Sequence, residues 1–288
     1  MVAPSFRRRV LATILCALPA LGTAAPGAAA DAPYSGSVRF SAVGREHSIS
    51  ARFGTGTVDV ASSCRPPVGE HCCFGAAPRS TGGPAFHDSD AGTILITRSG
   101  AAIGSIHRLP AGEYSRLYLG GGENLAISNV YWGSGDTLGV RASGGVIAPF
   151  DGSIVAPPAV EGLSPAVSMH RRLGPGPPAS PIAPTPVHVD AALTVSWKPA
   201  PGFTMEVTVA GTQGSTFCTV PDDAGTVEIP AGLLLYYKSG DRGTIVVTRL
   251  ARSEPQHPPS NASVIFEVSD TIVGPVIFTG TNVPHSAY

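Results

Sequence analysis

The residues with the most reactive side chains gather in one polar stretch, residues 62–91. His71-Cys72-Cys73 places an imidazole beside two thiols, and Cys64 lies earlier in the same stretch. Thiolates and imidazole are ligands for zinc or copper, whereas thiols in an oxidising compartment pair as disulfides. The two chemistries exclude one another, because oxidised cysteines do not ligate metal.

The spacing of these residues favours disulfides over a metal. No Cys-x-x-Cys or His-x-x-x-His pattern accompanies His71. His87 lies in the same stretch, and Asp88 and Asp90 follow it, but they lack the rest of a calcium-loop signature. We therefore expect no metal and no cofactor, and we keep His71, His87, Asp88 and Asp90 as the residues to inspect for one.

Four cysteines would remain after removal of a secretory leader: Cys64, Cys72, Cys73 and Cys218. Four cysteines allow three pairings, and a bond between the adjacent Cys72 and Cys73 cannot easily reach disulfide geometry. Cys64 would then pair with Cys72 or Cys73, and the other would pair with Cys218. In a second possibility Cys218 is a free buried thiol, because the alternation of its run could place it on a core face.

Catalytic motifs are absent from the chain, which has no Gly-x-Ser-x-Gly, His-Glu-x-x-His or Walker pattern. The aromatic pairs Tyr236-Tyr237 and Tyr131-Trp132, with Arg116, could form a binding face, although such residues usually pack in a sandwich core. The sequence favours a non-enzymatic structural or binding module. The alternatives are a secreted hydrolase or carbohydrate-active enzyme with a loop-built site, or a metal-binding protein that uses the 62–91 loop.

The N-terminus predicts export from the cytoplasm. Arg7-Arg8-Arg9 precedes an apolar run over residues 10–21, and Ala28-Ala29-Ala30 provides small residues for cleavage. The apolar run is too short to cross a bilayer core of about 30 Å as a helix. We expect a signal peptide over residues 1–30 and a secreted, periplasmic or extracellular mature chain with no membrane span.

Charge limits the partners of that mature chain. Residues 1–30 hold three Arg and no acid, so the net charge changes from −1 to −4 on cleavage, with 16 basic and 20 acidic residues left. Nucleic acid needs clustered Lys and Arg, which the chain lacks, so it is not an expected partner. A cell-surface polysaccharide or a protein could be one.

The elements that would position these residues are short strands. Residues 193–230 contain four runs rich in β-branched and aromatic residues, bounded by Gly, Pro or Asp, a pattern typical of an antiparallel sandwich. No sustained helical periodicity occurs, and residues 164–173 form the best helix candidate. Similar runs precede this region at residues 37–43, 47–53, 57–60, 93–97, 114–119, 126–132, 137–142 and 146–155. The fold class is all-β.

The runs divide into two tandem antiparallel, Ig-like β-sandwiches after the leader, at residues 31–156 and 157–288. The long loop at residues 62–91 belongs to the first. The Pro-rich stretch at residues 174–186 could be the linker between domains. We favour a loop within the second domain, because Pro157-Pro158 already follows an apparent final strand.

A resemblance supports this division. The segments Gly144-Gly145-Val146, Ala148-Pro149-Phe150-Asp151-Gly152-Ser153 and Leu193-Thr194-Val195-Ser196-Trp197 come in an order that resembles uncharacterised secreted bacterial proteins built from tandem β-sandwiches. The turn over residues 197–202 is also similar to fibronectin type III modules. The resemblance implies an Ig-like extracytoplasmic architecture and transfers no catalytic residue.

Overall fold

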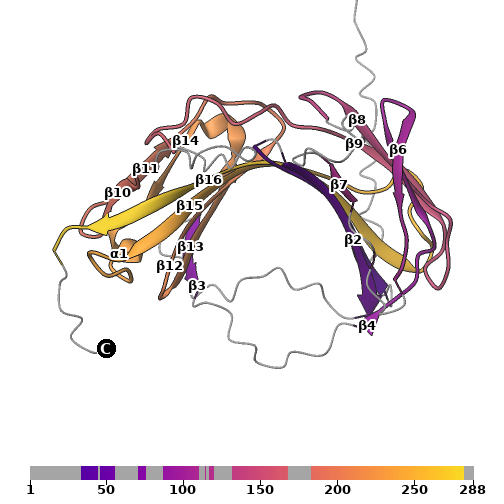
Figure 1. Ribbon diagram of the computed structural model, residues 1–288, viewed down its shortest axis with the longest axis horizontal. Helices are drawn as coiled ribbons and strands as arrows, with labels where there is room; N and C mark the ends of the chain where they lie inside the picture. Colours follow the sequence, from indigo (N-terminus) through magenta and orange to yellow (C-terminus); the bar gives the residue numbers. More distant parts are fainter. Residues whose placement is uncertain are drawn as a thin grey trace, which may run out of the picture. The chain divides into compact units, whose positions relative to one another are not determined.

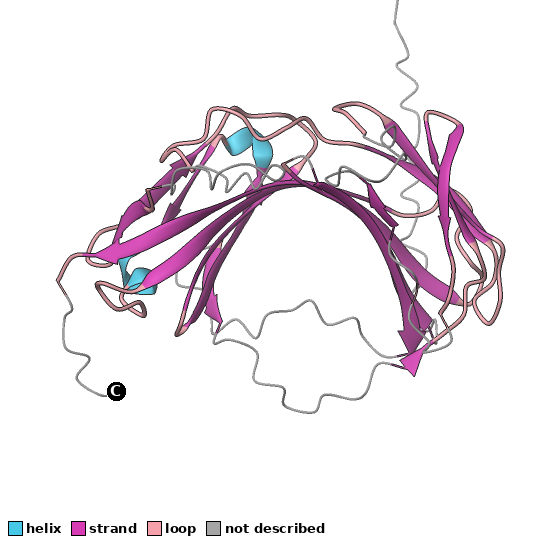
Figure 2. Ribbon diagram, viewed as in Figure 1, coloured by secondary structure: helices cyan, strands magenta, loops and turns pink. Residues whose placement is uncertain are grey.

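The computed structural model describes residues 34–44, 46–55, 71–75, 87–109, 114, 117–119, 132–167 and 183–281. In these residues nearly all regular structure is β-strand, with a four-residue helix, α1 (Ala231–Leu234), and a short 3-10 helix at Asp222–Ala224 (Figure 2). The all-β prediction is confirmed. The predicted signal peptide lies outside the described residues. Among the helices described, none has the length and apolarity to cross a bilayer.

A ten-stranded sheet is the largest element (Figure 1). Its main path runs β3-β13-β12-β15-β16-β1-β2-β4, while β10 pairs with β16 and β7 with β2. The β1–β16 and β10–β16 pairs are parallel, and the others are antiparallel. The strands are β1 (Tyr34–Val43), β2 (Glu46–Thr55), β3 (Cys72–Gly75), β4 (His87–Asp88), β7 (Leu117–Leu119), β10 (Thr185–His188), β12 (Thr204–Gly211), β13 (Gly214–Pro221), β15 (Arg242–Ser253) and β16 (Ala262–Thr279).

Two smaller sheets accompany it. One has four strands in the order β6-β5-β8-β9 and the other pairs β11 with β14. Their strands are β5 (Ile94–Arg98), β6 (Ala101–Ile106), β8 (Thr137–Ala142), β9 (Phe150–Val155), β11 (Leu193–Ser196) and β14 (Thr226–Ile229). The four runs predicted in residues 193–230 therefore divide between sheets, because β11 and β14 pair with each other while β12 and β13 join the large sheet.

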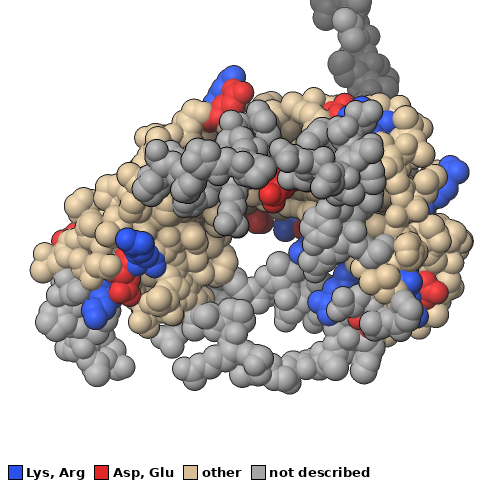
Figure 3. All heavy atoms as spheres, in the orientation of Figure 1, with Lys and Arg blue, Asp and Glu red and all other residues tan. Residues whose placement is uncertain are grey.

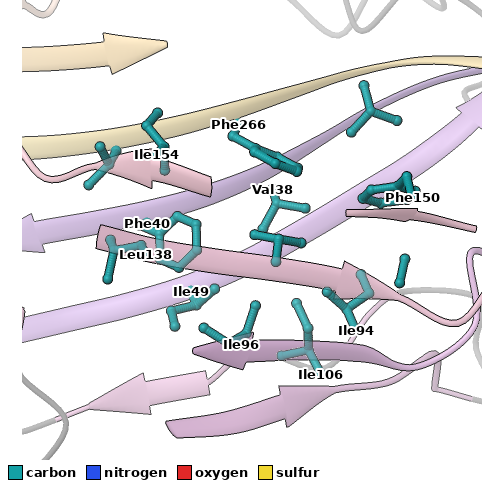
Figure 4. Packing of buried hydrophobic residues seen from close by; sticks show 14 of the residues in the cluster. Val38, Phe40, Ile49, Ile94, Ile96, Ile106, Leu138, Phe150, Ile154 and Phe266 are labelled. Atoms are coloured by element: carbon teal, nitrogen blue, oxygen red, sulfur yellow. The ribbon is translucent and has the colours of Figure 1, made fainter. Parts of the chain in front are cut away.

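The first core lies between the large sheet and the four-stranded sheet. Alternate residues of β1, including Val38 and Phe40, are buried with Ile94 and Ile96 of β5, as alternation along a strand requires (Figure 4). Phe266 of β16 contributes the aromatic neighbour of Phe150. This core contains no buried ion pair among the described residues.

The second core lies between the large sheet and the β11–β14 pair. It contains apolar residues of β12, β13 and β15, the Trp197 ring and both leucines of α1. Both cores use the even-numbered residues of β16, from Val264 to Val268 in the first and Val276 and Phe278 in the second. One face of β16 therefore supports both cores.

The opposite face of the large sheet carries a group of ion pairs. The Glu267 carboxylate pairs with the guanidinium groups of Arg39, at 2.6 Å, and Arg252, at 2.8 Å. Arg252 also approaches Glu206 at 3.5 Å. In the face shown by Figure 3, the basic and acidic atoms of described residues lie in small mixed groups.

Strand pairing crosses the predicted domain boundary at residues 156 and 157. β1 pairs with β16, and β3 pairs with β13. Apart from β16 in the first core and β3 in the second, the buried residues of each core come from one side of this boundary. The two predicted sandwiches therefore share the large sheet.

Candidate functional site

A disulfide joins Cys72 of β3 to Cys218 of β13, 146 residues apart in sequence. The two residues face each other directly in the antiparallel ladder. Cys73 is also disulfide-bonded, and Cys64 lies outside the described residues. Cys218 is therefore not the free thiol of the second possibility. In this oxidised state neither Cys72 nor Cys73 can supply a thiolate to a metal.

Strand β3 lies within the predicted 62–91 loop, so that stretch is not entirely loop. Phe74 of β3 stacks on Tyr236 with ring centroids 4.1 Å apart, and its ring edge meets Tyr237 at 5.9 Å. Tyr237 stacks in turn on Phe278 at 4.3 Å. These contacts hold the edge strand β3 against the second core, in addition to its disulfide.

The Tyr237 hydroxyl is a structural group. It donates to the Val209 carbonyl at 2.6 Å and accepts from the Thr216 main-chain N–H at 2.8 Å. Burial raises the pKa of Tyr237 to about 12. Tyr237 and Trp132 are buried in separate cores, so the predicted aromatic binding face does not contain both of them. Its other members Tyr131 and Arg116 lie outside the described residues.

A buried ion pair braces the second core. The Arg249 guanidinium donates to both carboxylate oxygens of Asp222, at 2.6 and 3.1 Å, and both side chains are almost fully buried. Its remaining donors reach the main-chain oxygens of Pro158 at 3.1 Å, Ala159 at 2.7 Å and Lys198 at 2.6 Å. Such saturation is what makes a buried charge pair tolerable.

Asp270 of β16 also holds this segment. Its carboxylate accepts the Val160 N–H at 2.8 Å. Burial raises the pKa of Asp270, while the Val160 hydrogen bond and the Arg249 charge lower it. Arg249 and Asp270 thus fix residues 158–160, which connect the two predicted domains, onto the large sheet.

A groove with a volume of about 390 Å³ lies beside the disulfide. Its lining is mainly apolar, and among the described lining residues Glu228 is the only acidic side chain and there is no Lys or Arg. The lining residues are His71, Cys72, Thr194, Val220, Pro221, Ala224, Thr226, Val227, Glu228 and Pro230. The volume is within the ordinary range of ligand pockets, about 300–1,000 Å³.

Strand β14 forms one wall of this groove and leaves an open edge. The main-chain N–H of Trp197 donates to the Gly225 carbonyl at 3.0 Å, just beyond the end of β11. This bond shows which residue pairs of the β11–β14 ladder are hydrogen-bonded. In an antiparallel ladder the bonded pairs alternate, so Val227 and Ile229 bond to β11 while the N–H and C=O groups of Thr226 and Glu228 point away from it. In the described residues no strand pairs with this edge.

The disulfide closes one end of that edge. The Cys72 Sγ lies 3.7 Å from the Glu228 main-chain oxygen. This is a packing contact, because a disulfide sulfur carries no hydrogen to donate. The groove therefore begins at Cys72 and extends past Thr226 toward Ala224.

The other predicted metal candidates lie elsewhere. His87 and Asp88 form β4, which lies at the opposite end of the main strand path from β3 and hence from His71. Asp88 pairs with Arg52 at 3.7 Å. Asp90 accepts the Gly92 N–H at 2.7 Å in a local turn. The structure does not bring these residues together with His71.

One further polar cluster escaped the sequence analysis. The His257 Nδ1 lies 3.1 Å from the Asp151 carboxylate, and the Gln256 amide donates to the Ser153 hydroxyl at 3.0 Å. These hydrogen bonds do not connect His257 to Ser153, so they form no relay to a nucleophile. Main-chain bonds between Asp151 and His257 show that the cluster fastens a turn to β9.

The comparisons with known proteins identify no family. No model of a known protein family matches the chain, and no curated protein matches it. Among solved structures, the chain is similar to one described as "Structures of Clostridium thermocellum CbhA fibronectin(III)-like modules", with 12% identity over 90% of this chain and 97% of that chain and a TM-score of 0.19. So low a TM-score carries no argument about the fold, which rests on the strands and contacts above.

Proposed function

We propose that this protein is a secreted, non-enzymatic binding module and that the groove beside β14 is its ligand site. The observation that carries the proposal is the open edge of β14, which borders a groove of ligand size. Ligand pockets are typically apolar with a few polar groups, as this lining is. The partner would be a protein or polysaccharide at the cell exterior.

The disulfide supports the location outside the cytoplasm. Disulfides form and persist in oxidising compartments and are rare in the cytosol. The Cys72–Cys218 bond braces the groove wall, and the predicted signal peptide would deliver the chain to such a compartment.

The polar groups of the second core support a binding role over catalysis. Arg249, Asp222 and Tyr237 are all occupied in hydrogen bonds that hold strands and segments together. A general acid or base must be able to reach a substrate, and these buried groups bond to the protein itself.

The test is expression of the full chain in a secreting bacterial host. We expect an oxidised protein in the exported fraction that turns over none of a panel of esterase, protease and glycosidase substrates. Turnover that is lost on a single His or Asp substitution would instead establish the hydrolase alternative. Retention in the cytoplasm with reduced cysteines would contradict export.

A further inference from the structure

We propose that the groove binds an extended peptide segment of a partner protein, which adds as a strand to the edge of β14 and places a Lys or Arg beside Glu228. This inference rests on the proposed function and names the class of ligand. It depends on three features of the described residues: the direction of the β14 main chain, the apolar groove beside it and the single acidic side chain in the lining.

The main chain of β14 offers the first feature. The N–H and C=O groups of Thr226 point away from β11, and so does the N–H of Glu228. Thr226 and Glu228 are separated by one residue, which is the spacing at which a neighbouring strand presents its own donors and acceptors. An unpaired strand edge of this kind is the template used in strand addition by peptide-binding domains.

The groove offers the second feature. Strand addition gains specificity from pockets that receive alternate side chains of the peptide. Val220, Pro221 and Pro230 give the groove apolar walls next to the open edge. An apolar side chain of an added strand can pack there while the neighbouring side chain points to solvent.

Charge provides the third feature. Glu228 is exposed and forms no ion pair in the described part of the chain. It is the only acidic residue among the described lining residues, which include no Lys or Arg. A cationic side chain is complementary to such a lining, and an acidic one would be repelled. Charge complementarity acts more on specificity and association rate than on affinity.

The edge of β14 is too short, and too covered at one end, to pair with a long strand of another chain. The strand is four residues long, and Cys72 packs against the Glu228 oxygen at one end. Short edge strands and covered ends are how native sheets avoid uncontrolled edge-to-edge association. The geometry therefore accommodates a short extended peptide better than a second full-length strand.

The direct test is amide hydrogen exchange in the oxidised full chain, with and without the alternating peptide (Lys-Val)4. In the free protein the Thr226 and Glu228 amides should exchange quickly, because their N–H groups face solvent. The peptide should slow both, by about tenfold or more, and leave the Val227 amide, which bonds to β11, with little change. Peptide binding without protection of Thr226 and Glu228 would overturn the inference.

Two variants test the contacts separately by fluorescence anisotropy of the labelled peptide. Glu228→Lys should weaken binding of (Lys-Val)4 by about fivefold and allow (Glu-Val)4 to bind, as expected for an exposed charge pair. Thr226→Pro removes one outward N–H and no main-chain bond to β11, although it also removes the hydrogen bond from the Thr226 hydroxyl to the Val195 carbonyl of β11, and it should weaken both peptides. Glu254→Lys, at an exposed acid just after β15 that does not line the groove, is the matched control and should change neither.

The remaining outcomes are also decisive. Concentration-dependent dimerisation that protects the same amides would make a second copy the occupant and overturn the peptide. Binding of a cell-surface polysaccharide at Thr226 and Glu228 would do the same. An exported, oxidised protein without turnover that binds no peptide contradicts this inference alone, whereas turnover contradicts the proposed function itself.

Discussion

The two cores lie on the same face of β16 but are stabilised differently. The first core is closed by apolar packing, and among the described residues His47 is the buried imidazole beside it, which meets Trp132 edge-on at 4.3 Å. The second core adds the Cys72–Cys218 disulfide and the Arg249–Asp222 pair. The groove beside the β14 edge belongs to this braced core.

The difference suggests a division of roles. A two-stranded sheet covers little apolar surface, so the β11–β14 pair needs additional fastening to the large sheet. Arg249 and Asp222 connect β15, the 3-10 helix and residues 158–159 at this point. A rigid second core can then expose the β14 edge without losing its structure.

Arg249→Met should have the largest effect on this comparison. Removal of one partner leaves the Asp222 carboxylate buried and uncompensated, which costs about 3–5 kcal/mol. Urea denaturation of the variant should show this loss. Arg252→Met, on the exposed polar face, should cost less than about 1 kcal/mol. Equal losses would mean that the buried pair is not a brace.

The double variant Cys72→Ala/Cys218→Ala should come next. Loss of a native disulfide that closes a long loop typically costs about 2–4 kcal/mol. Denaturation monitored by the fluorescence of Trp197, in the second core, should move to lower urea. An unchanged midpoint would show that the β3–β13 ladder and the Phe74 ring contacts hold β3 without this disulfide.

His47 should make the first core sensitive to acid. Burial lowers the pKa of His47 below its ordinary value of 6.5, so the unfolded chain takes up the proton first. The contribution of neutral His47 to the free energy of unfolding is therefore fully present above about pH 6.5 and falls as the pH decreases toward the lower pKa of the folded state. The loss is about 1.4 kcal/mol for each unit by which the folded and unfolded pKa values differ.

Thermal unfolding at about pH 7.5 and about pH 5 measures this effect. The wild type should lose more stability between the two values than His47→Gln, which cannot take up the proton. His188→Gln, at an exposed position of β10, serves as the control. A pH dependence that His47→Gln leaves intact would assign the titration to another group.

The smallest effect compares the packing of the two cores directly. Ile96 in the first and Ile245 in the second are both fully buried strand residues. Ile→Val at either position should cost about 0.5–1.5 kcal/mol. Similar losses in urea denaturation would confirm that the two cores are packed equally well and that the disulfide and ion pair add to this packing. A clearly larger loss at Ile245 would show that the disulfide and ion pair also prevent the second core from relaxing around the cavity left by the missing methyl group.

Local patterns in the sequence predicted individual strands well. Residues 137–142 form β8 with the predicted bounds, and the runs at 193–197 and 226–230 form β11 and β14 nearly as predicted. Alternation of apolar and polar residues is a local property of a strand, so it can be seen without knowledge of the partner strand. The large sheet could not be predicted in this way, because β16 pairs with β1 across more than 200 residues.

The candidate site was only partly visible. Cys72 and Cys218 were among the predicted disulfide residues, and Tyr236-Tyr237 among the predicted aromatic residues. Thr226 and Glu228 were not singled out, since an open edge depends on which strands pair and in which phase. His87, Asp88 and Asp90 share a sequence segment with His71, but β4 and β3 lie at opposite ends of the strand path.

The sequence alone determined the all-β class. For Cys218 it left three alternatives, which were a disulfide with Cys72, a disulfide with Cys73 and a free thiol. The tertiary structure decided between them. In the ladder Cys72 lies directly opposite Cys218, with a Cα–Cα distance of 4.1 Å, while Cys73 lies opposite Phe217. Successive side chains of a strand point to opposite faces, so only the register of β3 against β13 could select the partner.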